Sequence, residues 1–130
     1  MAPADAELIR IARPLVGGFP LSRPDLDAAT VACALRSASG RICTGVCVHL
    51  SCGIGFCAEH AAVAELLKHR ETEITAIVAV STTSVLPPCG RCRELLVQVD
   101  QRNFATLVTI APDRAVPLRT LLPDHWLELP

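Results

Sequence analysis

The chain has 130 residues, a length that suits one domain, residues 1–130, burying about two thirds of the surface that the unfolded chain exposes. Its formal net charge is -1, and it contains one Trp, three Phe and no Tyr, so it offers neither a basic surface nor stacking side chains for a polynucleotide. No apolar run reaches 18 residues, which argues against a membrane-spanning helix.

The cysteine content and the first residues indicate a reducing compartment. The chain has seven cysteines, an odd number, and it begins without the basic and apolar segments of a secretion signal. We therefore predict a cytoplasmic location with free thiols. Cys33 and Cys43 are expected to be small buried apolar side chains, and Cys52 has no predicted role.

The first half of the chain predicts a helix followed by a hairpin. Residues 5–16 repeat apolar side chains at helical spacing and end before a pair of glycines. Residues 29–36 and 41–48 are rich in Val, Ile, Thr and Cys and flank a Ser-Ala-Ser-Gly turn, which favours two antiparallel strands. A glycine-rich loop at residues 51–56 then leads to Cys57.

The second half alternates helices and strands. Residues 58–70 predict a strong helix, and residues 74–81 form a nearly continuous apolar run that is typical of a buried central strand. A helix at 89–99, a strand at 105–110 and a short helical turn at 117–123 complete the pattern. This alternation is typical of an α/β fold.

Two short motifs point to a metal centre: Cys-Ala-Glu at residues 57–59 and Pro-Cys-Gly-Arg-Cys at residues 88–92. A catalytic zinc ion requires three protein ligands and an open position for water. Glu59 follows the first cysteine by two residues, where its carboxylate can face the water without binding the metal. The pattern predicts a zinc-dependent deaminase with one zinc ion per chain and Glu59 as the proton shuttle. The predicted ligands are Cys57, Cys89 and Cys92.

Two other functions of a Cys-x-x-C pair are disfavoured by the remaining motif residues. A redox dithiol has no use for a distant Cys-Ala-Glu segment. A structural zinc site would require a fourth Cys or His rather than a carboxylate beside the first ligand. We therefore favour a catalytic zinc site over both alternatives.

The cysteines are predicted to lie at helix N-termini, where backbone N–H groups favour negative charge. Zinc with three thiolates carries a net charge of about -1, which makes bound water a weaker acid than on a zinc ion held by histidines. Arg91 and Arg93 are candidates to donate hydrogen bonds to the sulfur atoms. The alternative, a solvated surface side chain, remains open for each arginine.

With these motifs the chain resembles the cytidine deaminase superfamily and, within it, is most similar to the blasticidin S deaminase type. The resemblance implies a three-layer α/β/α fold with a mixed five-stranded sheet. It also implies a homotetramer whose active sites are completed by neighbouring subunits. The matching segments are residues 31–35, 40–46, 57–59, 88–93 and 121–123.

The resemblance also implies roles for individual groups. Glu59 would take a proton from the attacking water and return protons to the ring nitrogen and to the leaving ammonia. The backbone N–H groups of Ala58 and Cys89 would help to bind the substrate carbonyl and the attacking oxygen. His60 stands where several family members carry a charge-compensating Arg and is a candidate hydrogen-bond donor to a thiolate; the alternative is a partly exposed helix residue.

The chain departs from the family where nucleosides are bound. Cytidine deaminases carry an Asn and a Glu that bind the base and the ribose hydroxyls, and these positions are Cys47 and His49 here. The family's aromatic residue that packs on the nucleoside is replaced by Ala29. Because cysteine is a weak hydrogen-bonding partner, the site has little reason to prefer a ribonucleoside. We therefore expect an aminated free base, such as an aminopyrimidine or an aminotriazine, with Cys47 and His49 as candidate contacts.

Further substrate contacts are predicted at Phe56, Pro88 and Trp126, because the family closes its pocket with aromatics from the glycine-rich loop and the C-terminal tail. Core or interface packing is an equal alternative for the aromatics, and solvent exposure at a strand end is an equal alternative for His49. Three other functions stay open: a deaminase of cytidine or blasticidin S, a binding module stabilised by zinc, and a polynucleotide deaminase. The net charge argues against the last.

Overall fold

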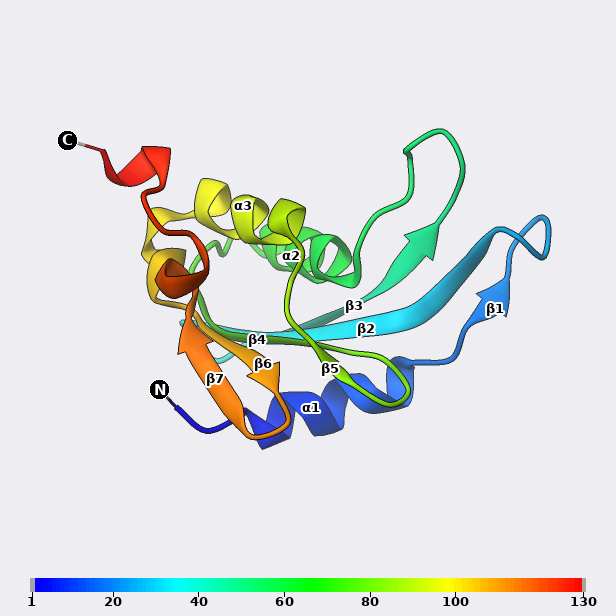
Figure 1. Cartoon of the computed structure of the whole chain (residues 1–130), viewed down its shortest axis with the longest axis horizontal. Helices are drawn as coiled ribbons and strands as arrows, with labels where there is room; N and C mark the ends of the chain where they lie inside the picture. Colours follow the sequence, from blue (N-terminus) through cyan, green and yellow to red (C-terminus); the bar gives the residue numbers. More distant parts are fainter. Residues whose placement is uncertain (1, 130) are drawn as a thin grey trace.

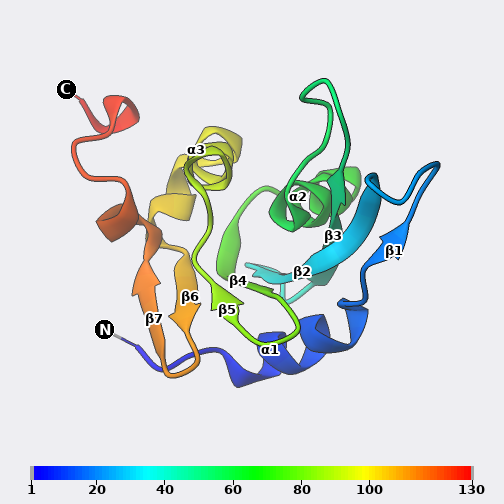
Figure 2. The ribbon, with the colours of Figure 1, turned by 45° about the vertical axis from the view of Figure 1, so that its right-hand side comes forward.

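A mixed sheet lies at the centre of the computed structural model, which describes residues 2–129. Helix α1 lies against one face of the sheet, and α2 and α3 lie against the other (Figures 1 and 2). The expected α/β fold with a mixed sheet is therefore confirmed. The helices are α1 (Ala6–Ala12), α2 (Ala58–Lys68) and α3 (Gly90–Val99), and the strands are β1 (Phe19–Pro20), β2 (Asp27–Ser37), β3 (Ile42–His49), β4 (Ile74–Val80), β5 (Val85–Leu86), β6 (Leu107–Ala111) and β7 (Arg114–Pro117).

Five longer strands follow the order β3-β2-β4-β6-β7, and the short strands β1 and β5 pair with β2 and β4. Strand β6 pairs parallel with β4, whereas β2 pairs antiparallel with both β3 and β4. The predicted hairpin and the predicted central strand are confirmed as β2, β3 and β4. Strands β1, β5 and β7 had not been predicted. Among the described residues, no helix combines the length and the apolar character needed to cross a bilayer.

Strand β2 supplies both faces of the core, because alternate residues of a strand point to opposite sides. Cys33 and Leu35 pack with α2 and α3, whereas Ala32 and Ala34 pack with α1. The small alanine side chains let α1 lie close to the sheet. Cys33 and Cys43 are both buried, as expected for cysteines that act as small apolar side chains.

The order of the strands brings two helix N-termini to one edge of the sheet. Strands β3 and β4 run in the same direction, because both are antiparallel to β2. Helix α2 follows β3, and α3 follows β4 and leads to the parallel strand β6. Both helices therefore begin beyond the carboxyl ends of their preceding strands, the usual location of ligand sites in α/β folds.

Helix α2 crosses β3 in direct backbone contact at Gly45. A Cβ atom on Gly45 would lie 2.5 Å from the nitrogen of Ala62 and 2.7 Å from the carbonyl oxygen of Ala58, closer than any side chain can approach. This contact fixes the height of α2 above the sheet, and it therefore fixes the position of Cys57, which precedes Ala58.

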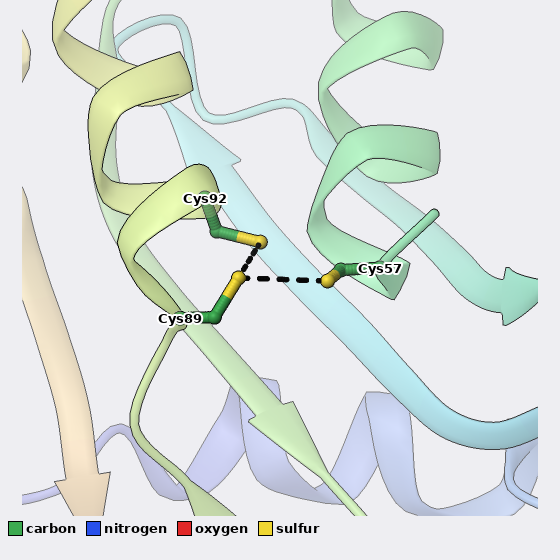
Figure 3. A group of neighbouring side chains, drawn as sticks. All are labelled: Cys57, Cys89 and Cys92. Carbon is green, nitrogen blue, oxygen red and sulfur yellow. Dashed lines mark hydrogen bonds between the residues drawn. The ribbon is translucent and has the colours of Figure 1, made fainter. Parts of the chain in front are cut away.

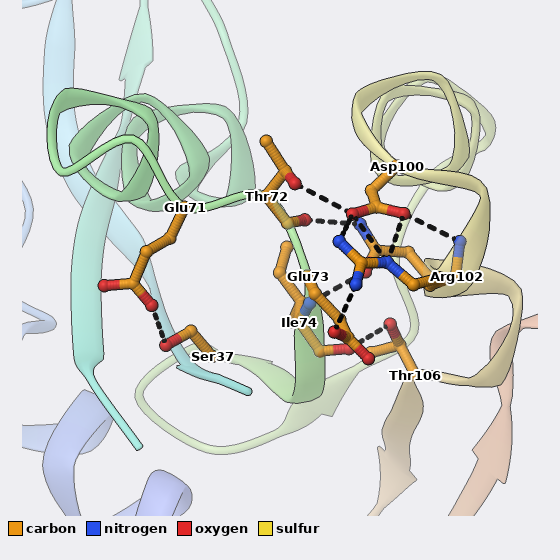
Figure 4. A network of polar contacts seen from close by, with 9 residues as sticks. Ser37, Glu71, Thr72, Glu73, Ile74, Asp100, Arg102 and Thr106 are labelled. Carbon is orange, nitrogen blue, oxygen red and sulfur yellow. Dashed lines mark hydrogen bonds and ion pairs between the residues drawn. The ribbon is translucent and has the colours of Figure 1, made fainter. Parts of the chain in front are cut away.

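A buried amide joins α3 to the start of β4. The side chain of Asn103 accepts a hydrogen bond from the backbone N–H of Ile74 at 2.7 Å and donates to the carbonyl oxygens of Leu96 at 2.8 Å and Thr72 at 3.1 Å. Beside it, the hydroxyl of Thr72 donates to the carboxylate of Asp100 at 2.8 Å (Figure 4). This network holds the C-terminal end of α3 and thereby supports the helix that carries two of the cysteines.

Replacing Asn103 with Ala should lower the free energy of unfolding by about 3 kcal/mol, because three buried backbone groups lose their partner. Urea denaturation followed by circular dichroism measures the change. Gln98→Ala, which removes an exposed amide on the neighbouring helix α3, is the matched control and should change stability by less than about 0.5 kcal/mol. Equal effects of the two substitutions would contradict the assigned role of Asn103.

Asp100 should make the stability of the protein depend on pH. Hydrogen bonds from Arg102 hold the pKa of the Asp100 carboxyl at about 2, below its ordinary value. Because the folded pKa is depressed, the stabilisation is complete above the unfolded pKa of about 4 and is lost as the pH falls through the folded pKa.

The stability difference between the wild type and Asp100→Asn should therefore be about 1 kcal/mol at neutral pH and shrink between about pH 4 and pH 2. Denaturation curves at a series of pH values measure it. In an Arg102→Ala background the same substitution should have a smaller effect at neutral pH. A difference that stays constant with pH would contradict the assignment.

Candidate metal centre and its cavity

Cys57 and Cys89 are the N-cap residues of α2 and α3, and Cys92 lies in the first turn of α3. Both N-caps have extended backbones, so the positive end of each helix dipole lies next to a sulfur-bearing side chain. Figure 3 shows the three side chains pointing toward one another across the gap between the two helices.

The three sulfur atoms have the spacing that a zinc ion requires. The Sγ atom of Cys89 lies 3.6 Å from that of Cys57 and 3.4 Å from that of Cys92, and all three lie within 4.8 Å of one another. Tetrahedral zinc, with Zn–S bonds of about 2.3 Å, places its sulfur ligands about 3.8 Å apart. The three cysteines therefore fit the zinc ion expected from the sequence, and a tetrahedral ion bound to them would keep a fourth position for a further ligand.

The surroundings of the sulfur atoms favour metal binding over three free thiolates. Burial raises the pKa of the Cys57 and Cys92 thiols, and the neighbouring acid and thiol groups raise that of Cys92 further. Burial acts in the same direction on Cys89, but hydrogen bonds from the backbone and from the neighbouring thiols outweigh it and lower the pKa of Cys89. A divalent cation supplies the positive charge that three adjacent thiolates need.

Glu59 lies in the first turn of α2 with only 5% of its surface exposed. Burial raises the pKa of its carboxyl, and hydrogen bonds from its own backbone and from Cys92 oppose this in part. The residue also lines the same cavity as Cys57 and Cys89. A buried carboxyl group beside these cysteine sulfurs can exchange protons with a molecule held in the cavity.

The cavity has a volume of about 480 Å³ and lies between the two helix N-termini and the end of the hairpin. Apolar side chains form most of its wall, and the polar groups are few. Its lining residues are Val31, Cys47, Val48, His49, Leu50, Gly53, Gly55, Phe56, Cys57, Glu59, Ala79, Leu86, Pro87, Cys89 and Arg91.

The predicted contacts Cys47, His49 and Phe56 all line this cavity. Pro88 lies with Glu59 beside a small adjoining hollow. Ala58 is fully buried in the first turn of α2, where only its backbone can serve a ligand. The structure thus places three of the predicted contacts on the cavity wall and Pro88 beside the adjoining hollow.

Cys47 and His49 differ in what they offer to a ligand. The sulfur of Cys47 accepts a hydrogen bond from the backbone N–H of Val31 at 3.3 Å and lies 3.2 Å from the hydroxyl of Thr30. The Nδ1 atom of His49 lies 2.8 Å from a carboxylate oxygen of Asp27 on the neighbouring strand. The sulfur of Cys47 is thus engaged within the protein, whereas one ring nitrogen of His49 remains available.

The three candidate charge-compensating residues have different surroundings. The Nδ1 atom of His60 lies 3.6 Å from the sulfur of Cys92, within reach of a weak hydrogen bond. Arg93 instead donates to the carbonyl oxygen of Pro88 at 2.8 Å and to that of Leu121 at 3.3 Å. These bonds tie the segment before Cys89 to the C-terminal part of the chain. Arg91 lines the cavity with an exposed side chain.

Trp126 lies outside the cavity lining, because the C-terminal segment is held against α3. The carboxylate of Glu94 accepts hydrogen bonds from Nε2 of His125 at 2.7 Å and from Nε1 of Trp126 at 3.1 Å. The His125 ring also packs edge to face on Phe104. Sequence reasoning missed Glu94 and His125, because nothing local to either residue indicates that they meet.

Other residues of the site were also missed. Leu86 and Pro87 line the cavity, and their position in a proline-rich loop before the second motif could have indicated this. Asp27, the partner of His49, could not have been found in this way, because it lies before the predicted strand.

No protein-family model matches the chain. Cytidine deaminase of Mycobacterium tuberculosis is 37% identical over 89 residues, which cover 67% of this chain and 65% of that protein. The chain thus spans slightly less than two thirds of the length of the curated relatives it matches.

Solved structures match over nearly the whole chain. A crystal structure of Mycobacterium tuberculosis cytidine deaminase is 32% identical with a TM-score of 0.75, and the match covers 92% of this chain and 94% of that chain. Cytidine deaminase from Mycobacterium leprae, at 24% identity and a TM-score of 0.73, shares the fold, and the match covers 91% of this chain and 96% of that one.

Replacing Cys92 with Ala should reduce the zinc content of the purified protein from about one ion per chain to well below half, because two thiolates bind zinc much more weakly than three. Atomic absorption measures the metal. Cys52→Ala, an exposed cysteine outside the cluster, is the control and should keep its zinc. Full zinc content in Cys92→Ala would contradict the assigned ligand set.

Proposed function

The chain belongs to the cytidine deaminase family, and from this premise we propose that it is a zinc-dependent hydrolytic deaminase of a small aminated heterocycle. One observation carries the proposal: three cysteine sulfurs lie together at two helix N-termini, next to a cavity that is also lined by a buried glutamate. A net charge of -1 further favours a small substrate over a polynucleotide.

The residues divide the reaction between them. Zinc, when bound by Cys57, Cys89 and Cys92, would supply a Lewis acid that makes water nucleophilic near neutral pH. Glu59 takes a proton from the water that attacks the amine-bearing carbon, and it returns protons to the ring nitrogen and to the departing amine. One water is consumed, the C–N bond breaks, and ammonia and a carbonyl product are released. The first-turn N–H groups of both helices orient the ring edge that reacts.

We propose a free base as the substrate, such as an aminopyrimidine or an aminotriazine. Two features support this. The sulfur of Cys47 is already hydrogen-bonded within the protein, and most of the cavity wall is apolar. A ribose would therefore find few partners for its hydroxyls, and unpaired polar groups weaken binding.

A nucleoside substrate, such as cytidine or blasticidin S, is the second candidate. The names of the relatives favour it, since the proteins matched are cytidine deaminases. The cavity, at about 480 Å³, also has room for a molecule larger than a single base. Relative kcat/KM values for cytosine and cytidine separate the two candidates.

The proposal includes a cytoplasmic homotetramer. Free cysteines suit a reducing compartment. Large apolar side chains are exposed at several places along the chain, and such groups are often covered by a second subunit. They include Phe19, Ile54, Trp126 and Leu129. Sedimentation analysis would measure the mass of the assembly.

Replacing Glu59 with Gln should lower kcat for ammonia release by at least about 10²-fold, because the amide cannot take up the proton that the carboxylate transfers. The assay couples ammonia release to a dehydrogenase over a panel of cytosine, isocytosine, guanine, aminotriazines, cytidine and blasticidin S. The zinc content of the variant should remain near one per chain, since Glu59 is not a ligand.

Glu65→Gln is the matched control, because Glu65 is a half-exposed carboxylate on the same helix that pairs with Lys68. It should keep the activity of the wild type. Zinc-loaded protein that releases no ammonia from any member of the panel would instead indicate a non-catalytic binding module. Activity that survives Glu59→Gln would remove Glu59 from the mechanism.

A further inference from the structure

His49 and Asp27 form a polar pair at the end of the hairpin, next to the cavity. The two residues lie opposite each other in the pairing of β2 with β3. The Nδ1 atom of His49 lies 2.8 Å from a carboxylate oxygen of Asp27. His49 lines the cavity and Asp27 does not. The His49 ring therefore lies between the cavity and the carboxylate of Asp27.

The Asp27 carboxylate selects the tautomer of the His49 ring. An ionised carboxylate can only accept a hydrogen bond, so Nδ1 carries the hydrogen of the pair. In the neutral ring the other nitrogen, Nε2, is then an acceptor. No protein partner of Nε2 occurs among residues 2–129 in the contacts of this ring. The pair therefore presents one oriented acceptor to a ligand.

This acceptor has few competitors in its part of the cavity. The neighbouring side chains Val31, Leu50 and Phe56 are apolar, and the sulfur of Cys47 already accepts from the backbone. The remaining polar side chains of the cavity are Cys57, Cys89, Glu59 and the donor Arg91. A substrate N–H that lies outside the reach of Glu59 therefore has His49 as its side-chain acceptor.

We propose that His49, held by Asp27, accepts a hydrogen bond from a ring N–H of the substrate and thereby selects free bases over N-alkylated ones. This inference rests on the proposed deaminase function. A free aminopyrimidine such as cytosine carries an N–H directly across the ring from the amine-bearing carbon. A nucleoside carries a sugar carbon at that nitrogen and has no hydrogen to donate. With the amine at Glu59, the N–H is the donor that points away from the metal end.

The decisive comparison uses cytosine against 1-methylcytosine, in which a methyl group replaces the hydrogen on the nitrogen across the ring from the amine-bearing carbon. The wild type should favour the unmethylated base by about tenfold or more in kcat/KM, because the methyl group removes one hydrogen bond and leaves the Nε2 acceptor of His49 without its partner. The preference should lie mainly in KM, because the bond exists before and during the reaction. The zinc-loaded protein is used throughout.

The variants separate hydrogen bonding from simple steric exclusion. His49→Leu should bring the ratio of methylated to unmethylated rates to within about threefold of one, whereas His49→Gln, which keeps an acceptor oxygen, should restore part of the preference. Asp27→Ala should weaken the preference by raising KM for the unmethylated base, because the His49 ring loses the carboxylate that orients it. Asp25→Ala, an exposed carboxylate two residues away, is the control and should change nothing. A preference that persists in His49→Leu would overturn the proposal.

Binding of the deaminated products gives a readout that needs no turnover. Calorimetry should show that the wild type binds uracil about tenfold more tightly than 1-methyluracil and that His49→Leu does not discriminate between them. Equal affinities in the wild type, or binding of neither compound, would overturn the role of His49 even if deamination occurs. If the protein releases no ammonia but still binds uracil more tightly than 1-methyluracil, the deaminase function is wrong and the role of His49 in recognising a ring N–H remains.

Discussion

The convergence of three cysteine sulfurs is the constraint on which the rest of the site depends. They lie within 4.8 Å of one another, although they belong to two helices separated in sequence by strand β4. Adjacent thiolates repel one another, and burial raises the pKa of two of the three thiols, so the deprotonated cluster requires a divalent cation. The sheet makes this convergence possible, because β3 and β4 run in the same direction on either side of β2. A metal ion bound by these cysteines would therefore link the positions of two helix N-termini.

Much of this arrangement was predictable because its signals are local. The metal motifs, the helical spacing after each of them and the apolar run of β4 are each contained within a few consecutive residues. The short strands could not be predicted, because they are too short to carry a local signal of their own. Strands β1 and β5 have two residues each, and β7 has four. Pro20 and Pro117 also end β1 and β7, and proline indicates a strand edge or no strand at all. These pairings form only because longer neighbours supply the partners.

The partner of His49 shows a different limit of sequence reasoning. Extending the register that pairs Ala34 with Thr44 would place His49 opposite Ala29. The register shifts between Ala28 and Ala32, where Ala29 adopts a φ of 68°, and Asp27 comes opposite His49 instead. A bulge of this kind leaves no clear mark in the sequence, because alanine is not a residue that favours positive φ. The contacts of Glu94 with His125 and Trp126 are equally unpredictable, since about thirty residues and two strands separate them.

The cavity consequently has two ends that are built from different parts of the chain. Helix N-termini and the close crossing at Gly45 position the sulfur atoms and Glu59. The end of the β2–β3 hairpin positions Cys47 and His49, with Asp27 behind them. Side chains at the hairpin end can therefore differ without a change in the helix N-termini that carry the sulfur atoms and Glu59. Strand β3 supports both ends of the cavity, because Gly45 lies under α2 while Cys47 and His49 lie further along the same strand. A change of side chain at the hairpin end is therefore compatible with the cysteine cluster only if it leaves the crossing at Gly45 in place.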